Sequence, residues 1–209
     1  SSAASDVYKR QLPAAGQLTN NGVAVTAGAS VSAADIAAGK LRFAPAANAS
    51  SATYATFTFK VQDNGGTANG GVDTDVKARA MTIAVTAVND APKGAAKTVT
   101  MLKNKIYTFA TNDFGFSDAS DSSADALQAV KITTLPGAGK LTNNGVAVTA
   151  GAWGSAADIA AGRLKFAPAA NGRGNPYAKF TFQVRDSGGT ANGGIDTDPV
   201  ARTITIVVK

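Results

Sequence analysis

The chain lacks the residue types on which most enzymes depend. Its 209 residues include no cysteine, no histidine and no glutamate. Without histidine or cysteine the sequence excludes an ordinary zinc or copper site, a Ser-His-Asp or Cys-His nucleophile, and an imidazole that carries protons near neutral pH. We therefore expect a protein that is not an enzyme, because few groups remain for general acid–base catalysis.

Metal binding in such a chain has to use oxygen ligands. All 14 acidic residues are aspartate. Aspartate carboxylates, asparagine side-chain carbonyls and main-chain carbonyls in Gly-rich turns form the ligand set that calcium accepts. The absence of cysteine does not identify the redox compartment, since calcium-stiffened surface proteins and cytosolic proteins both dispense with disulfides.

Charged residues make up only 16% of the chain and aromatic residues 7%. The net charge is +6, but the basic residues are scattered singly, whereas nucleic-acid binding calls for Lys and Arg clustered with aromatics on one face. We expect no nucleic-acid partner, and acidic glycans or lipopolysaccharide remain the candidate polyanions. No apolar run approaches the length of a membrane span. Abundant Gly, Ala, Thr and Val are typical of an all-β protein.

The chain contains an internal repeat. Residues 12–86 (repeat 1) align without a gap with residues 135–209 (repeat 2), and roughly 50 of about 75 positions are identical. Residues 1–11, SSAASDVYKRQ, have no counterpart before repeat 2. They resemble adapter read-through at the end of a sequencing read, so we interpret them as a non-native leader outside the fold.

Periodicity predicts strands and one helical turn in the region from 91 to 209. Alternating residues predict strands at 97–102, 105–111 and 127–134, and Asn144-Gly145 predicts a hairpin into 146–149. Residues 155–162 read as a helical turn that Ser155 caps, so Asp158 and its equivalent Asp35 are interpreted as structural. The predicted inward side chains are Val99, Met101, Tyr107, Phe109, Val130, Ile132, Leu164, Phe166, Phe180, Phe182, Val184, Ile204, Ile206 and Val208.

About seven strands in roughly 110 to 120 residues is the pattern of an immunoglobulin-like β-sandwich. We predict an all-β chain of tandem immunoglobulin-like repeats, with a complete repeat at 91–209. The region 12–90 is predicted to be a partial repeat, because it lacks the equivalents of residues 97–134 and with them its first three strands.

Three phrases resemble a known family. Between the repeats lies Ala87-Val-Asn-Asp-Ala-Pro92, the end of one strand reads Val-x-Asp-x-Gly-Gly, and the last strand reads Thr-Ile-x-Val. Together they resemble the cadherin-like, VCBS-type tandem repeats of large bacterial surface adhesins of the RTX type. The resemblance covers nearly all of residues 12–209. It implies cadherin-like sandwich units that share calcium ions where successive domains meet.

Strand parity predicts which residues meet at that boundary. In an antiparallel unit of seven strands, the loops after the second and sixth strands return to the end at which the chain enters. This brings together three distant stretches, and clustered carboxylates repel one another unless a cation neutralises them. We therefore predict a calcium site formed by Asn89, Asp90, Asp118, Asp121 and Asp186, with Asp113 as a further candidate.

A second arrangement remains open for the metal. The loop that follows Asp186 could hold an ion by itself through Asn192, Asp196 and Asp198. In repeat 1 the equivalent residues are Asn69, Asp73 and Asp75, and Asp63 corresponds to Asp186. Each of these aspartates taken singly is also typical of an ordinary turn.

The predicted function is mechanical. Calcium-stiffened repeats would extend a bacterial surface protein away from the cell in adhesion or biofilm formation, with the neighbouring repeats as partners and an extracellular location. One alternative is a glycan-binding module that uses Trp153, Tyr177 and the 170–176 turn. A second alternative is an accessory domain of an extracellular hydrolase.

Overall fold

The computed structural model describes residues 6–121 and 124–209. The chain divides into two compact units, Ser1–Ala87 (unit 1) and Val88–Lys209 (unit 2). Strands dominate both units, and the helices among the described residues are single short turns. The prediction of an all-β protein is therefore confirmed.

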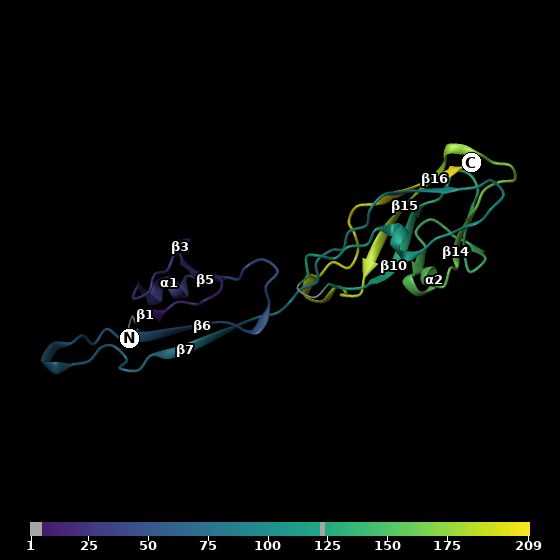
Figure 1. The fold of residues 1–209 in the computed structure, drawn as a ribbon. Coiled ribbons are helices and arrows are strands. Elements are labelled where there is room, and N and C mark those ends of the chain that lie inside the picture. The colour runs from purple at the N-terminus through teal and green to yellow at the C-terminus, as the bar shows by residue number, and fades with distance from the viewer. Residues whose placement is uncertain (1–5, 122–123) are drawn as a thin grey trace. The chain divides into compact units, whose positions relative to one another are not determined.

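Unit 2 consists of two sheets (Figure 1). The five-stranded sheet has the order β13-β10-β15-β16-β8, and the four-stranded sheet has the order β12-β11-β14-β9. The elements are β8 (Lys97–Met101), β9 (Tyr107–Thr108), η2 (Thr111–Phe114), β10 (Leu127–Thr134), β11 (Lys140–Asn143), β12 (Val146–Ala147), β13 (Trp153–Ser155), α2 (Ala156–Ala160), β14 (Leu164–Ala167), β15 (Gly174–Asp186), η3 (Ala191–Gly193) and β16 (Arg202–Val208).

The two sheets of unit 2 enclose one hydrophobic core. Phe109, which follows β9 in the four-stranded sheet, packs edge-to-face on Phe180 of β15 with ring centroids 5.6 Å apart. Period-two alternation places one face of each strand inward. Apart from Tyr107, which is half-buried and packs against the core, every predicted inward side chain is buried.

Three predicted strands are shorter than the sequence indicated, and the first of them, predicted at 97–102, ends at Met101. The prediction of a strand at 105–111 is wrong outside Tyr107–Thr108, because residues 111–114 form the turn η2. The Asp113 carboxylate accepts a hydrogen bond from the Ala110 amide at 2.9 Å and so favours the turn over an extended chain. The strand predicted at 146–149 ends at Ala147.

The helical turn at α2 confirms the interpretation of Asp158. The Ser155 hydroxyl accepts a hydrogen bond from the Asp158 amide at 3.0 Å, as an N-cap residue does. The Asp158 carboxylate in turn pairs with Arg163 at 2.6 Å. Repeat 1 reproduces this arrangement with Ser32, Asp35 and Lys40.

Unit 1 has the corresponding elements with fewer strands. Its sheets have the orders β4-β1-β6-β7 and β3-β2-β5. The elements are β1 (Asp6–Gln11), β2 (Gln17–Asn20), β3 (Val23–Ala24), β4 (Ser30–Val31), α1 (Ala33–Ala37), β5 (Leu41–Ala44), β6 (Ser51–Gln62), η1 (Ala68–Gly70) and β7 (Arg79–Val85).

The interpretation of residues 1–11 as lying outside the fold is wrong for residues 6–11; residues 1–5 lie outside the described part of the chain. Strand β1 pairs antiparallel with β6 and with β4. The pair Val7–Val31 has the same register as Val130–Gly154 in unit 2, so β1 takes the place of β10. Without β1 this edge of β6 would leave its backbone groups unpaired, and β1 pairs with them.

Unit 1 buries its sheet faces less completely than unit 2. Val61 and Met81 are 41% and 48% exposed, whereas their equivalents Val184 and Ile204 are both 0% exposed. In unit 2 the strand β8 pairs with β16, but in the described part of unit 1 no strand pairs with the outer edge of β7. The missing strands thus leave apolar side chains in solvent.

Candidate metal centre

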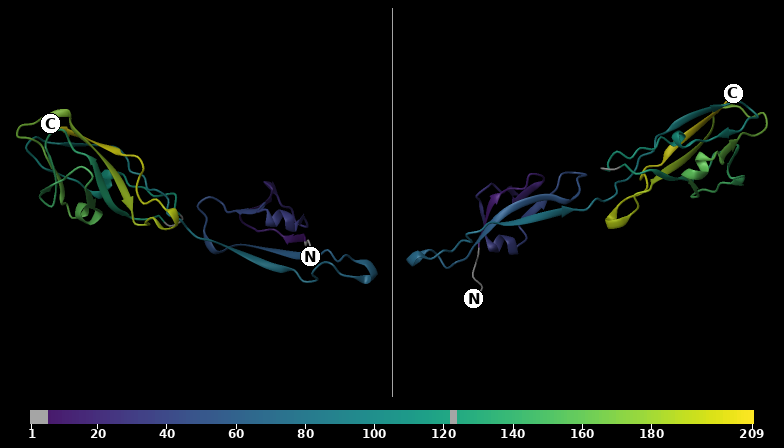
Figure 2. Two further views of the ribbon diagram at one scale, coloured as in Figure 1. Left: turned by 180° about the vertical axis from the view of Figure 1, so that it is seen from behind. Right: turned by 60° about the horizontal axis from the view of Figure 1, so that its bottom comes forward.

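Three distant stretches meet at one end of unit 2. They are the segment before β8, the loop between η2 and β10, and the loop after β15. Figures 1 and 2 show this end where the chain enters the unit, and the C-terminus at the opposite end. The geometry agrees with the parity argument, because an even number of antiparallel strands returns the chain to its starting end.

Asn89 joins the entering segment to the loop after β15. Its side-chain amide donates to the Asp186 carboxylate at 3.2 Å, to the Gly189 carbonyl at 3.1 Å and to the Ile195 carbonyl at 2.9 Å. The Asn89 carbonyl accepts a hydrogen bond from the Ile195 amide at 3.0 Å. These contacts fix the orientation of the Asn89 side chain, and none of them uses its Oδ1 atom.

Three carboxylates of the loop before β10 form a cluster. One oxygen each from Asp118, Asp121 and Asp125 lies within 4.8 Å of the others. Asp118 accepts a hydrogen bond from the Asp125 amide at 2.9 Å, and Asp121 accepts one from the Asp90 amide at 3.1 Å. The loop therefore folds around its own acidic groups and also holds the entering segment.

Asp186 lies against this cluster and is only 1% exposed. Burial raises the pKa of Asp186, and the charges of Asp118 and Asp125 raise it further, while donors from Gly188 and Asn89 act in the opposite direction. Burial also raises the pKa of Asp118, to which the neighbouring charges of Asp121 and Asp125 add. Both shifts show that this end of the unit disfavours negative charge as long as no cation is present.

Two buried oxygens at the cluster have no hydrogen-bond partner among the described residues. They are Oδ1 of Asn89 and Oδ1 of Asp118. Asp118 is only 6% exposed. A buried oxygen without a donor costs about 1 to 3 kcal/mol, and more when it is charged. A hard cation could take such oxygen atoms as ligands, because they are held in place and lack a hydrogen-bond donor.

The cluster differs from the other acidic residues in its charge balance. Within residues 6–121 and 124–209, five aspartates pair with a basic side chain, and none of these belongs to the cluster. These ion pairs are Asp35–Lys40, Asp75–Arg79, Asp113–Lys97, Asp158–Arg163 and Asp198–Arg202. The carboxylates that come together without a basic side chain are thus those of Asp118, Asp121, Asp125 and Asp186.

Asp113 has contacts of its own. Its carboxylate pairs with Lys97 at 2.7 Å and accepts hydrogen bonds from the Tyr107 hydroxyl and the Ala110 amide. These three partners satisfy the group in a structural role, and the structure does not bring it into the cluster of Asp118, Asp121 and Asp125.

The contacts in the loop after β15 favour a structural role for Asp198. Burial alone would raise the pKa of Asp198, but hydrogen bonds from the Gly94 amide and from Arg202 hold it below its usual value. Asp196 accepts a hydrogen bond from the neighbouring Thr197 hydroxyl, and Asn192 is an exposed turn residue with φ of 55°. Since Arg202 already neutralises Asp198, these residues suit a turn better than an ion.

The equivalent residues of unit 1 are engaged locally. Asp63 accepts a hydrogen bond from the Gly65 amide, and Asp73 accepts one from the Gln62 side chain. Asp75 pairs with Arg79, and Asn69 is a turn residue with φ of 55°. Among the described residues, no group of three acidic side chains that could hold a metal ion includes Asp63.

Asp125 is the cluster residue that the sequence analysis missed. It lies at the end of the polar stretch before β10, and its carboxylate accepts a hydrogen bond from the Ser187 hydroxyl at 2.9 Å. The spacing of Asp118, Asp121 and Asp125, at three and then four residues, was the available signal. It carried little weight because a loop has no fixed period.

Comparison of the chain with protein-family models, curated proteins and solved structures finds no match. Within the described residues, no helix has the length and hydropathy needed to cross a membrane.

Proposed function

We propose that the chain is a segment of a bacterial cell-surface adhesin, in which calcium stiffens tandem immunoglobulin-like units. The observation that carries this proposal is the group of Asp118, Asp121, Asp125 and Asp186, which lies where the chain enters unit 2 and has no basic partner in the ion pairs of the described residues. The strand order of unit 2 supports the sandwich, since its two sheets share one core.

Calcium suits this ligand set better than a softer metal. The available ligands are carboxylate oxygens and an asparagine carbonyl, and calcium takes six to eight oxygen ligands in a flexible arrangement. Asp118, Asp121, Asp125 and Asp186 would supply charge, and Asn89 would supply the neutral oxygen Oδ1. Burial and then the neighbouring carboxylates raise the pKa values of Asp118 and Asp186, and a bound divalent cation would act against both causes.

The position of the site explains how a bound cation would stiffen the entrance of unit 2. Asn89 and Asp90 belong to the segment by which the chain enters unit 2, whereas Asp118 and Asp186 belong to loops of the unit itself. A cation held by both would prevent the entering segment from swinging. In a tandem array every junction would then have a fixed direction, and the chain would extend a binding region away from the cell surface.

Small-angle X-ray scattering on several tandem copies of residues 88–209 tests this function. In calcium we expect a rod whose maximum dimension grows linearly with the number of copies, and in EDTA a shorter and broader distribution. The matched control carries Asp118→Asn in every copy and should scatter alike in both conditions. Identical scattering of the unaltered array with and without calcium would contradict the proposed stiffening.

A further inference from the structure

A second surface of unit 2 carries basic residues around the single tryptophan of the chain. Alternation along β10 and β15 turns Val130 and Val184 into the core and leaves Lys131 and Arg185 on the outer face of the five-stranded sheet. The register between β10 and β13 places Trp153 directly beside Lys131. The three side chains, Lys131, Trp153 and Arg185, form what we call the Trp153 platform.

Both cations lie over the indole ring. The Cζ atom of Arg185 is 4.4 Å from the ring centroid and the Nζ atom of Lys131 is 5.7 Å from it, which are cation–π distances. Neither cation belongs to any of the ion pairs among the described residues. Within residues 6–121 and 124–209, the buried Nε atom of Arg185 has no acceptor. The Trp153 platform therefore holds two positive charges that none of these ion pairs neutralises.

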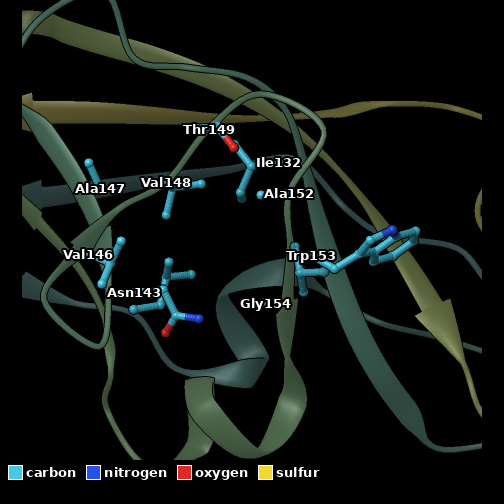
Figure 3. A pocket seen from close by; sticks show the side chains of 11 residues that line it. Ile132, Asn143, Val146, Ala147, Val148, Thr149, Ala152, Trp153 and Gly154 are labelled. Atoms are coloured by element: carbon cyan, nitrogen blue, oxygen red, sulfur yellow. The ribbon is translucent and has the colours of Figure 1, made fainter.

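The indole ring of Trp153 lies at the surface of unit 2. Trp153 is 39% exposed. Trp153 is among the residues that line an apolar pocket of about 220 Å³, with Val146 and Ile132, but Figure 3 shows the indole turned away from that pocket. The ring does not fill the core, so its exposed part is open to a ligand, and the half-buried side chains of Lys131 and Arg185 lie beside it.

The fold of the repeat does not require this platform. In repeat 1 the positions equivalent to Trp153 and Arg185 are Ser30 and Gln62, and the strands β4 and β6 form there all the same. An aromatic ring and a basic side chain that occur together in only one of two otherwise similar repeats indicate a role specific to unit 2.

We propose that the Trp153 platform binds an anionic saccharide through a carboxylate-bearing sugar. The apolar face of a sugar ring suits an exposed aromatic surface, while Arg185 and Lys131 match a carboxylate in charge-assisted hydrogen bonds. A nucleic acid would require a longer track of basic residues, and in the described part of the chain the cations that lie over this ring are Lys131 and Arg185. The site is independent of the proposed calcium site, because alternation places Arg185 and Asp186 on opposite faces of β15.

The fluorescence of Trp153 reports on this site directly, since the chain has no other tryptophan. We propose to titrate the full chain with tri-galacturonate, with its methyl ester and with a short DNA duplex, in the absence of added calcium. Saturable quenching by tri-galacturonate that weakens at high salt is the expected result. The methyl ester, which has the same rings without the charges, should bind at least about 10-fold more weakly.

Variants separate the platform from general charge. Arg185→Gln installs the residue that repeat 1 carries at Gln62, and it should weaken binding at least about 10-fold while the urea midpoint stays close to that of the wild type. Lys165→Gln removes an equal charge from the other sheet and should leave binding unchanged. The proposal is overturned if tri-galacturonate does not quench, if its ester or the duplex binds as tightly, or if Arg185→Gln binds like the wild type.

Discussion

Asp118→Asn should change the stability of unit 2 in opposite directions with and without calcium. The substitution removes one negative charge from the cluster. It keeps a side-chain oxygen that can still accept the hydrogen bond from the Asp125 amide, which is 2.9 Å long in the structure. Charge is therefore altered while the loop geometry is retained.

The size of both effects follows from the cluster geometry. The carboxylate oxygens of Asp118, Asp121 and Asp125 lie within 4.8 Å of one another, and two unit charges at such a distance repel by about 1 kcal/mol in water. Removing two such pairs should stabilise the metal-free protein by about 1 to 2 kcal/mol. With calcium at about 100 times its Kd, the wild type should gain about 2.7 kcal/mol, and the variant should lose most of this gain.

The pH dependence has a definite sign. Burial and neighbouring charges raise the pKa of Asp118 in the folded state. The protonated form of Asp118 therefore favours the folded protein at low pH, and this contribution to the unfolding free energy is lost as the pH rises through the raised pKa. The metal-free difference between Asp118→Asn and the wild type should therefore be largest near neutral pH. It should vanish below about pH 3.9, the ordinary aspartate pKa, where Asp118 is protonated in both states.

Urea unfolding followed by Trp153 fluorescence measures these differences, because the only tryptophan of the chain lies in unit 2. The reasoning is refuted if Asp118→Asn destabilises the protein in EDTA as well as in calcium. It is also refuted if calcium stabilises the variant as much as it stabilises the wild type.

Three further predictions concern the fold around the site. Asp158→Ala should leave calcium affinity unchanged in calorimetry, because its carboxylate serves the α2 turn; a loss of affinity would contradict that assignment. Phe182→Ala should lower the unfolding free energy by about 3 to 5 kcal/mol, whereas Phe59→Ala, at the less buried equivalent site, should cost less than half as much in the same urea assay. Amide hydrogen exchange should be slower across 97–208 than across 12–85, and equal protection would show that unit 1 completes its core.

Local patterns in the sequence were enough to predict much of unit 2. The strand predicted at 127–134 coincides with β10, and the Asn144-Gly145 turn has the positive φ angles of 51° and 79° expected of its hairpin. Strand parity, together with the resemblance to cadherin-like repeats, predicted that Asn89, Asp118 and Asp186 lie at one end of the unit. These predictions share a cause, since residue alternation and strand count can be read from the sequence without knowledge of the tertiary contacts.

The errors arose where tertiary contacts override local pattern. Residues 105–111 alternate like a strand, yet Asp113 bonds the Ala110 amide and turns the chain after Thr108. Asp125 was not predicted as a member of the cluster, because a loop has no period from which to predict the direction of a side chain. Residues 6–11 became β1 because β6 presents an unpaired edge, which the segment's own sequence does not reveal.

Isothermal titration calorimetry of the full chain with calcium tests the proposed metal site most directly. Asp186→Asn and Asp63→Asn make the same substitution at equivalent positions of the two repeats, but only Asp186 lies against the acidic cluster. We predict saturable calcium binding by the wild type, the same binding by Asp63→Asn, and its loss in Asp186→Asn. Absence of binding by the wild type, or binding that Asp186→Asn leaves unchanged, would contradict a calcium site at the entrance of unit 2.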